Sequence, residues 1–388
     1  MNPPDPVALT QALVRMDTVN PPGQEAQCVA LLAGLLTAAG FDCRTHDFAP
    51  QRTSLVARFG GQPGASGSAA PLCFTGHVDV VPLGGAVWQH PPFGAEIAAG
   101  RLYGRGSSDM KSGVAAFTCA AIAHALKAGD RLRDGPGLCL IITAGEETGC
   151  EGAFAMAAAP EAHDLLGTAG ALVVAEPTAN QPLLGHKGAF WLSAQASGIT
   201  AHGSMPERGD NAVYRIAEAA LALQGFTFET GAHLLMGAPT LNVGTVRGGL
   251  NINSVPDAAE LGIDIRTVAG QDHGRVLQCL CRVLGPKIAL RPLLDVGSVY
   301  TEPDDPWMQR VFGLCAARSG QMPVPGTVTY FTDAAALRLP LGLPPIVILG
   351  PGEPGMAHQT DEYCEVARIH EATALFADLI TDWCGAAA

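Results

Sequence analysis

Side chains of the kind that ligate metals follow apolar stretches or open a small-residue loop at five places in this sequence. They are His77, Asp109, the pair Glu146 and Glu147, Glu176, and His358. Short apolar runs predict buried strands, and in an open α/β sheet ligands gather beyond the carboxyl ends of the strands. Two imidazoles and several carboxylates at such an edge suit a pair of divalent metals, with zinc as the first choice. A two-metal site that activates water predicts a hydrolase.

His77 and Asp79 are two residues apart and come shortly after an apolar run at residues 72–74. On an extended segment, two such side chains point to the same side. A carboxylate beside a metal-bound imidazole fixes its tautomer and raises its basicity, so Asp79 is predicted to support His77. Taken alone, the same two residues also fit an ordinary loop.

Asp109 lies in a segment rich in glycine and serine, residues 104–113. The spacing of the glycines matches neither the dinucleotide fingerprint nor the Walker pattern. A loop of small residues that brings one carboxylate close to two cations fits better, because one Asp can bridge metals that are about 3.5–4 Å apart. A nucleotide-binding α/β protein is the alternative from another class, and it rests on this loop alone.

Glu146 and Glu147 directly follow the apolar run at residues 138–143. Two adjacent carboxylates after a buried strand would repel each other without a cation. One can ligate a metal while the other takes a proton from the attacking water. Two solvated loop glutamates are the alternative for this pair alone. The common placement of all five positions at predicted strand ends favours one shared site.

The composition is typical of a globular protein with two domains. The chain has 388 residues, of which 48% are hydrophobic and 15% charged. A net charge of −13 without a basic stripe argues against a nucleic-acid partner. The 11 cysteines are scattered, mostly in apolar runs, so we expect reduced thiols rather than a disulfide framework, and a cytoplasmic location.

Neither the N-terminal residues nor the apolar stretches of the sequence predict targeting to a membrane. Residues 1–6 lack the basic and apolar segments of a signal peptide. Apolar stretches stay below the roughly 18 residues that a membrane span needs, so we expect no membrane partner.

Periodicity places the secondary structure that must position these side chains. Helices are predicted at residues 7–16, 27–39, 112–128, 211–224, 274–284 and 365–383, and strands at 55–59, 72–74, 138–143, 172–174, 189–196, 260–267 and 345–349. Residues 60–70, rich in glycine, serine and alanine, are predicted to form a mobile surface loop.

A change of pattern after about residue 182 predicts two domains. The strands before Glu146 and Glu176 are nearly continuous apolar runs, as in central strands buried on both faces. The strands at 189–196 and 260–267 alternate apolar and polar residues, as half-buried antiparallel strands do. We therefore expect a smaller α+β domain, residues 183–293, inserted into an α/β catalytic domain formed by residues 1–182 and 294–388.

Together, the motifs of this chain resemble those of the dinuclear zinc amidohydrolases, a family that includes acetylornithine deacetylase, succinyl-diaminopimelate desuccinylase, aminoacylase and the glutamate carboxypeptidases. The matching segments run in order through the whole chain. They are residues 18–23, 75–82, 88–93, 104–113, 145–147, 175–178, 201–204, 253–256, 264–266, 332–333 and 357–363. The resemblance implies a three-layer α/β catalytic domain with a mixed sheet. It also implies an inserted α+β, ferredoxin-like domain that serves as lid and dimerisation domain of a homodimer.

The resemblance also implies a ligand set for two metal ions per subunit. His77 and Glu176 would hold one zinc ion. Glu147 and His358 would hold the second, and Asp109 would bridge the two. Cobalt or manganese could replace zinc in the same ligand set. The peptide bond after Asp109 is often cis in this family.

Catalytic roles follow from the same resemblance. Glu146 would be the general base for a water that bridges the two zinc ions, and Asp79 would orient His77. His202 resembles a histidine that reaches across the dimer and stabilises the tetrahedral oxyanion. A capped turn before Pro206 is the alternative for His202.

Substrate contacts are implied for four further residues. Arg266 matches an arginine that pairs with the substrate carboxylate, and a plain charge at a strand edge is its alternative. Asn253, Thr332 and Gly352 would help to position the substrate.

The function implied is hydrolysis of the amide bond of N-acyl amino acids. Glu at position 176 is typical of the deacylases and carboxypeptidases of the family, whereas aminopeptidase and dipeptidase members tend to carry Asp. Residues 357–363 look most like acetylornithine deacetylase. The alternative within the family is a metallo-carboxypeptidase or dipeptidase that acts on peptides. A non-catalytic relative kept for binding is disfavoured, because every catalytic position is intact.

Overall fold

The computed structural model describes residues 2–61, 65, 67–128 and 135–385. These residues form two compact units. The first comprises Met1–Gly185, Tyr300–Gly326 and Thr332–Ala388, and the second comprises His186–Val299 and Thr327–Phe331. Among the described residues, no helix is both long and apolar enough to cross a membrane. The predicted surface loop at 60–70 lies partly outside the described residues.

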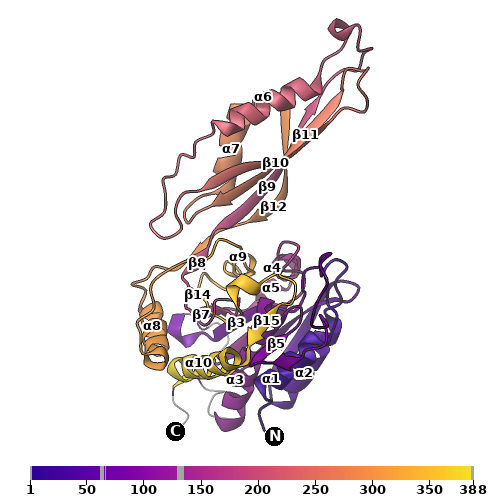
Figure 1. The fold of residues 1–388 in the computed structure, drawn as a ribbon. Coiled ribbons are helices and arrows are strands. Elements are labelled where there is room, and N and C mark those ends of the chain that lie inside the picture. The colour runs from indigo at the N-terminus through magenta and orange to yellow at the C-terminus, as the bar shows by residue number, and fades with distance from the viewer. Residues whose placement is uncertain (1, 62–64, 66, 129–134, 386–388) are drawn as a thin grey trace. The chain divides into compact units, whose positions relative to one another are not determined.

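A six-stranded mixed sheet forms the centre of the first unit (Figure 1). Its strands, in spatial order, are β1 (Asp42–Ala49), β2 (Arg52–Phe59), β6 (Leu138–Thr143), β3 (Leu72–His77), β7 (Ala171–Val174) and β14 (Ile346–Ile348). The pairs β1–β2 and β2–β6 are antiparallel, and the remaining pairs are parallel. Every residue of β3, β6 and β7 is buried, as predicted from their continuous apolar sequences.

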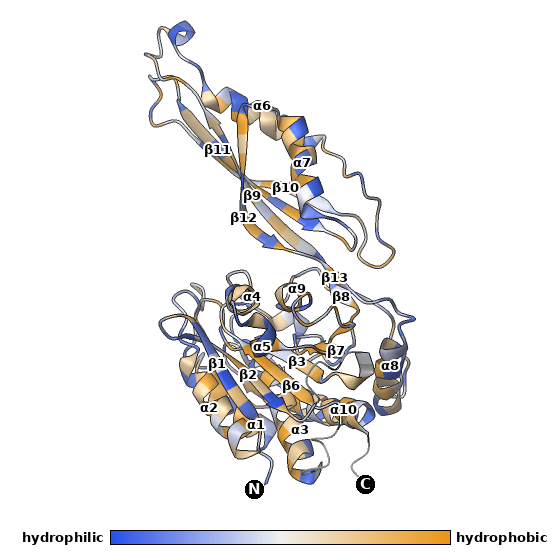
Figure 2. Cartoon of the chain, turned by 180° about the vertical axis from the view of Figure 1, so that it is seen from behind, coloured by the Kyte–Doolittle hydropathy of each residue, from blue (hydrophilic) through white to orange (hydrophobic). Residues whose placement is uncertain are grey.

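Helices cover both faces of this sheet, which gives three layers (Figure 1). One face carries α1 (Pro6–Val14), α2 (Ala26–Ala38), α3 (Ser112–Ala128) and α10 (Val366–Cys384), and the other carries α4 (Glu151–Ala158), α5 (Ala162–Leu166) and α9 (Ala334–Leu337). Helix α8 (Pro306–Ser319) packs on α10. Figure 2 shows that β3 and β6 are strongly apolar between these layers. The predicted α/β class with a mixed sheet is confirmed.

Short elements complete the first unit and its connections. A three-stranded sheet consists of β4 (Ile97–Ala98), β5 (Arg101–Tyr103) and β15 (Tyr363–Glu365), and β8 (Gly185–His186) pairs with β13 (Val299–Tyr300). Short helical turns occur at Gly67–Ala69 and Pro354–Met356 in this unit and at Pro206–Arg208 in the second unit. The segment Ser107–Lys111 is a kinked turn in which Asp109 and Met110 have non-helical backbone angles.

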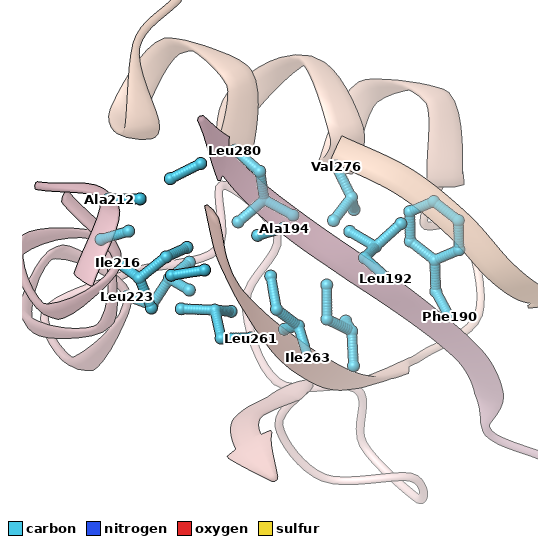
Figure 3. Close-up of a cluster of buried hydrophobic side chains, with 14 residues drawn as sticks. Phe190, Leu192, Ala194, Ala212, Ile216, Leu223, Leu261, Ile263, Val276 and Leu280 are labelled. Atoms are coloured by element: carbon cyan, nitrogen blue, oxygen red, sulfur yellow. The ribbon is translucent and has the colours of Figure 1, made fainter. Parts of the chain in front are cut away.

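The second unit is a four-stranded antiparallel sheet with two helices on one face. Along the chain its elements are β9 (Gly188–Ser197), α6 (Ala212–Gln224), β10 (Thr240–Gly248), β11 (Ala258–Thr267), α7 (His273–Leu284) and β12 (Ile288–Val296). The spatial order β10-β11-β9-β12 is that of a βαββαβ, ferredoxin-like unit. Figure 3 shows its core, in which Ile216 of α6 and Leu280 of α7 meet Leu192 and Leu261 of the sheet.

Polar caps mark where the helices of the second unit begin. The Asn211 side chain accepts the backbone N–H groups of Val213 and Tyr214 at the start of α6. The Asp272 side chain accepts the N–H of Arg275 at the start of α7. These contacts satisfy amides that have no partner within a helix, which stabilises each first turn.

The predicted helices agree with the structure within a few residues, and α3 agrees at both ends. The short strands β4, β5, β8, β13 and β15 were not predicted, and in the two larger sheets three strands were missed as well, namely β1, β10 and β12. Each of these last three is the terminal strand of its sheet and is exposed over much of its length. Such strands lack the apolar period that identifies central strands.

Candidate metal centre

The parallel strands of the first unit bring several candidate ligands to one edge of the sheet. His77 is the last residue of β3, Glu146 and Glu147 follow β6, and Glu176 follows β7. In the parallel ladder, His77 is paired with Thr143 of β6, and Thr75 is paired with Val174 of β7. Because parallel strands end on the same side, the side chains that follow them lie close together.

Asp109 lies between the two imidazoles. Its Oδ1 is 3.3 Å from His77 Nε2, and its Oδ2 is 3.4 Å from His358 Nε2. Asp109 is buried at the turn that precedes α3, and its peptide bond to Met110 is cis, as the resemblance implied. His358 belongs to the loop after β14 and has a φ of 64°. Each oxygen of the Asp109 carboxylate therefore faces the Nε2 atom of a different histidine.

Three glutamates surround this core. Glu147 Oε2 is 3.1 Å from His358 Nε2, while Glu146 Oε2 and Glu176 Oε1 are each 3.9 Å from His77 Nε2. Ligand atoms of His77, Asp109 and Glu147 all lie within 4.8 Å of one another. The predicted ligands and the predicted base are thus neighbours in the folded chain.

Asp79 is fully buried and holds both sides of the cluster. Its Oδ1 is 3.5 Å from His77 Nδ1, and its backbone carbonyl lies 2.9 Å from the same nitrogen. Its two carboxylate oxygens accept the backbone N–H groups of Glu146 and Glu147, at 3.1 and 3.2 Å. Asn20 Nδ2 donates to Asp79 Oδ2 at 2.9 Å. With Nδ1 occupied, His77 presents Nε2 to the carboxylates.

A glycine lets the chain after β6 turn into the site. Gly145 has a φ of 76°, a backbone conformation that other residues rarely adopt. The turn places Glu146 and Glu147 over the end of the strand, where Asp79 accepts their amides.

The electrostatics of the cluster favour a cation. Burial, with the charge of Asp109, raises the pKa of Glu147 to about 7 and raises that of Glu176 well above its usual range. Hydrogen bonds to Asp109 and Glu147 raise the pKa of His358 to about 10. Glu147 Oε1 is buried and accepts no hydrogen bond within the described part of the chain. Imidazole nitrogens and carboxylate oxygens in this number fit zinc, cobalt or manganese.

Two predicted substrate contacts, Thr332 and Gly352, belong to the first unit. Thr332 is fully buried, and its hydroxyl accepts the backbone N–H of Ala334 at 3.2 Å. Gly352 lies against the loop that carries Asp109, since a Cβ added to it would be 2.2 Å from Ser108 O. A glycine is therefore required there for close packing, and a role in substrate binding stays a prediction.

The other predicted residues, His202, Asn253 and Arg266, belong to the second unit. His202 is exposed, and its Nδ1 lies 2.7 Å from Ser204 Oγ. The backbone carbonyl of Asn253 accepts the N–H of Gly203 at 2.7 Å. Arg266 Nε lies 3.0 Å from Asp264 Oδ1 on the same strand. Their roles toward a substrate stay predictions.

Sequence reasoning assigned no role to several residues that support the cluster. Asn20 donates to Asp79, and Arg105 and Glu362 form a buried ion pair beside the loop of Asp109. The Thr143 hydroxyl, at the end of β6, donates to Asp333, which is also buried. Thr143 lies outside the segments that the family resemblance covers. The other four, Asn20, Arg105, Asp333 and Glu362, lie within such segments, but a motif does not show which groups a side chain contacts.

The chain is similar to curated relatives over almost its entire length. It is 32% identical over 403 residues to succinyl-diaminopimelate desuccinylase of Cereibacter sphaeroides, covering 98% of this chain and 99% of the relative. It is also 32% identical over 401 residues to succinyl-diaminopimelate desuccinylase 2 of a Ruegeria species, covering 98% and 95% of the two chains.

Solved structures share the fold. An M20 family metallo-carboxypeptidase from Sulfolobus solfataricus, Sso-CP2, superposes with a TM-score of 0.75 at 17% identity, over 98% of this chain and 99% of that chain. Aminopeptidase PepT from Bacillus cereus superposes with a TM-score of 0.72 at 19% identity, over 97% and 98%. Residues 73–382 match the sequence profile of Peptidase family M20/M25/M40. The chain therefore belongs to this family of metal-dependent hydrolytic enzymes.

Proposed function

We propose that the protein is a deacylase that hydrolyses the amide bond of N-acyl amino acids, with N-succinyl amino acids as the first class to test. The observation that carries the proposal is the position of Asp109 between the imidazoles of His77 and His358, with Glu146 beside them. The names of the 32% identical relatives support an acyl substrate over a peptide.

The proposed ligand roles follow the family resemblance, and the clustering of these side chains supports them. His77 and Glu176 would hold one metal, and Glu147 and His358 would hold the other, with Asp109 shared between them. Zinc is the expected metal, and cobalt or manganese suits the same donors. When bound, two such metals would polarise the amide carbonyl and lower the pKa of the attacking water.

Glu146 is the proposed general base. It is buried beside His77, and its backbone N–H is held by Asp79, so its carboxylate is oriented before a substrate binds. Glu146 takes a proton from the attacking water and passes it to the amide nitrogen as the C–N bond breaks. The products are a carboxylate and a free amino acid.

His202 of a second copy is proposed to stabilise the tetrahedral oxyanion by donating a hydrogen bond. Because the His202 side chain is exposed, it can contact a group outside the second unit. Arg266 is proposed to pair with the carboxylate of the substrate, while Asn253, Thr332 and Gly352 help to position the substrate. All five assignments rest on the family resemblance.

A homodimer formed through the second unit, the proposed lid and dimerisation domain, is part of this proposal. Strand β10 is terminal in its sheet, so one row of its backbone groups points away from β11. Beside it, a groove of about 670 Å³ is lined by Leu221, Phe228 and Leu241 among others. An apolar groove next to an unpaired strand edge supports association with a second copy. A cytoplasmic location stays a prediction.

An amine-release assay tests the proposal. The substrates are N-succinyl-diaminopimelate, N-acetylornithine, other N-acetyl amino acids and a set of dipeptides, each with metal-free protein and with protein given two equivalents of zinc. Zinc-dependent release from an N-acyl amino acid is expected. Amine release from dipeptides alone would favour the peptidase alternative. No amine release from any of these substrates by zinc-loaded protein would contradict the proposal.

A further inference from the structure

Glu362 is a fully buried carboxylate that receives hydrogen bonds from the loop of Asp109. Its Oε1 accepts the backbone N–H groups of Ser108 and Asp109, at 2.8 and 3.0 Å. Its Oε2 accepts the backbone N–H of Gly106 at 3.0 Å and Arg105 Nη1 at 2.8 Å. Both oxygens are thus bonded to the segment that carries the shared candidate ligand.

Arg105 extends the same contact to two other segments that carry candidate ligands. It is buried, with 1% of its surface exposed. Its Nη2 donates to the backbone carbonyls of Pro82 and His358, at 3.3 and 3.4 Å, and its Nη1 donates to that of Gln359 at 3.1 Å. The guanidinium therefore joins the chain after His77 to the loop of His358.

Backbone contacts tie these segments further. The Ser108 hydroxyl donates to Tyr363 O at 2.7 Å and accepts the N–H of Glu353 at 2.8 Å. Gly104 N–H donates to Glu362 O at 2.8 Å, and β15 pairs with β5 directly beside it. These hydrogen bonds thus hold the loop of His358 and the loop of Asp109 in a fixed position relative to each other.

We propose that the Arg105–Glu362 ion pair is a positioning device that fixes the separation of Asp109 and His358 before a metal binds. A carboxylate is suited to this task because it accepts from several amides at once and has no proton to direct at them. A guanidinium is suited because its planar fork reaches several carbonyls together. Neither side chain is a ligand, and both act through the residues that they hold. The inference rests on the proposed metal site.

Glu362→Gln tests this idea with the metal itself as the probe. Glutamine keeps the size of the side chain but directs an NH₂ group at backbone N–H donors. Cobalt affinity of the metal-free protein is measured by competition with a chelator, together with the visible absorption of the cobalt-loaded protein. We expect affinity to fall by about 10–100-fold and the cobalt spectrum to shift, because the geometry of the ligands is altered.

Glu25→Gln is the matched control. Glu25 is equally buried in the same unit, and both its oxygens accept from Arg52 Nε at 3.1 Å. Both variants should lower the melting temperature of the metal-free protein, since each disrupts a buried ion pair. Only Glu362→Gln should change the cobalt affinity and the spectrum.

Arg105→Lys serves as a second variant that keeps the charge. Lysine cannot reach the carbonyls of Pro82, His358 and Gln359 with one planar group. Weaker cobalt binding by this variant supports the inference even where Glu362→Gln does not fold. Folded Glu362→Gln or Arg105→Lys protein with the parent's affinity and spectrum would overturn it. Parent protein that binds neither cobalt nor zinc would instead overturn the proposed metal site, and the inference with it.

Discussion

Asp79 accepts the backbone N–H of Glu146 with its Oδ1 at 3.1 Å, so one buried carboxylate orients the proposed base through the main chain. The same oxygen lies 3.5 Å from His77 Nδ1. The candidate ligand and the candidate base are therefore both held by the side chain of Asp79.

Asp79→Asn should weaken metal binding by about 10–100-fold, because the amide replaces one of the two acceptors that orient His77 and the turn at Glu146. Zinc affinity is measured by chelator competition. Asp361→Asn is a suitable control, since Asp361 accepts the backbone N–H groups of Gln89 and His90 at the surface instead. Equal zinc affinity of the parent and Asp79→Asn would refute the supporting role of Asp79.

Glu146→Gln should bind both metals but lose about 10²–10⁴-fold in kcat, because glutamine cannot accept the proton of the attacking water. The measurement combines turnover with zinc content per subunit. Near-parental turnover would remove Glu146 as the base. Loss of zinc together with turnover would instead make Glu146 a ligand.

His202→Ala should lower kcat by about 10²–10³-fold, as expected for loss of one hydrogen bond to the oxyanion. If His202 acts on the second copy, mixing this variant with Glu146→Gln and allowing exchange should restore part of the activity. Each mixed dimer then contains one site with both groups intact. Absence of any recovery after proven exchange would contradict action across a dimer.

His186 should make stability depend on pH. Burial lowers the pKa of this imidazole to about 4, against its bond to Lys187 O, while an unfolded histidine titrates near 6.5. Below pH 6.5 the unfolded chain binds the extra proton and the folded chain does not. Stability is therefore complete above pH 6.5 and declines toward pH 4, by up to about 3 kcal/mol.

Urea unfolding of the parent and His186→Gln between pH 7.5 and 5 measures this contribution. The difference between the two curves removes the effect of the carboxylate cluster, which both proteins share. The variant should lose less stability than the parent as the pH falls. Parallel curves for the two proteins would show that His186 does not titrate as a buried group.

Central elements of the first unit were predictable because their patterns are local. The strands that precede His77, Glu146 and Glu176 are continuous apolar runs, and a buried parallel strand requires such a run whatever its neighbours are. The residues that follow such strands meet at one edge of the sheet. The ligand types and their convergence could therefore be predicted from the chain alone.

The edge strands β1, β10 and β12 could not be predicted in the same way. Within the described residues strand β10 pairs with β11 alone, and its register shifts between Val243 and Thr245. Strand β12 contains Pro292 and shifts its register between Pro292 and Leu294. Strand β12 pairs with β9, far earlier in the chain, whereas β1 and β10 each pair with the strand that follows next. All three are strands because a neighbour offers a free edge, which their own residue pattern does not display.

The identity of the chemistry in this protein depends on residue types, which the sequence displays directly. The support of that chemistry depends on packing between distant segments. From the sequence around it, Glu362 is expected to lie at the surface. Folding instead buries it among amides of residues 106–109, more than 250 positions earlier in the chain. Its role arises from tertiary structure because a carboxylate acquires these donors only when the two loops pack together.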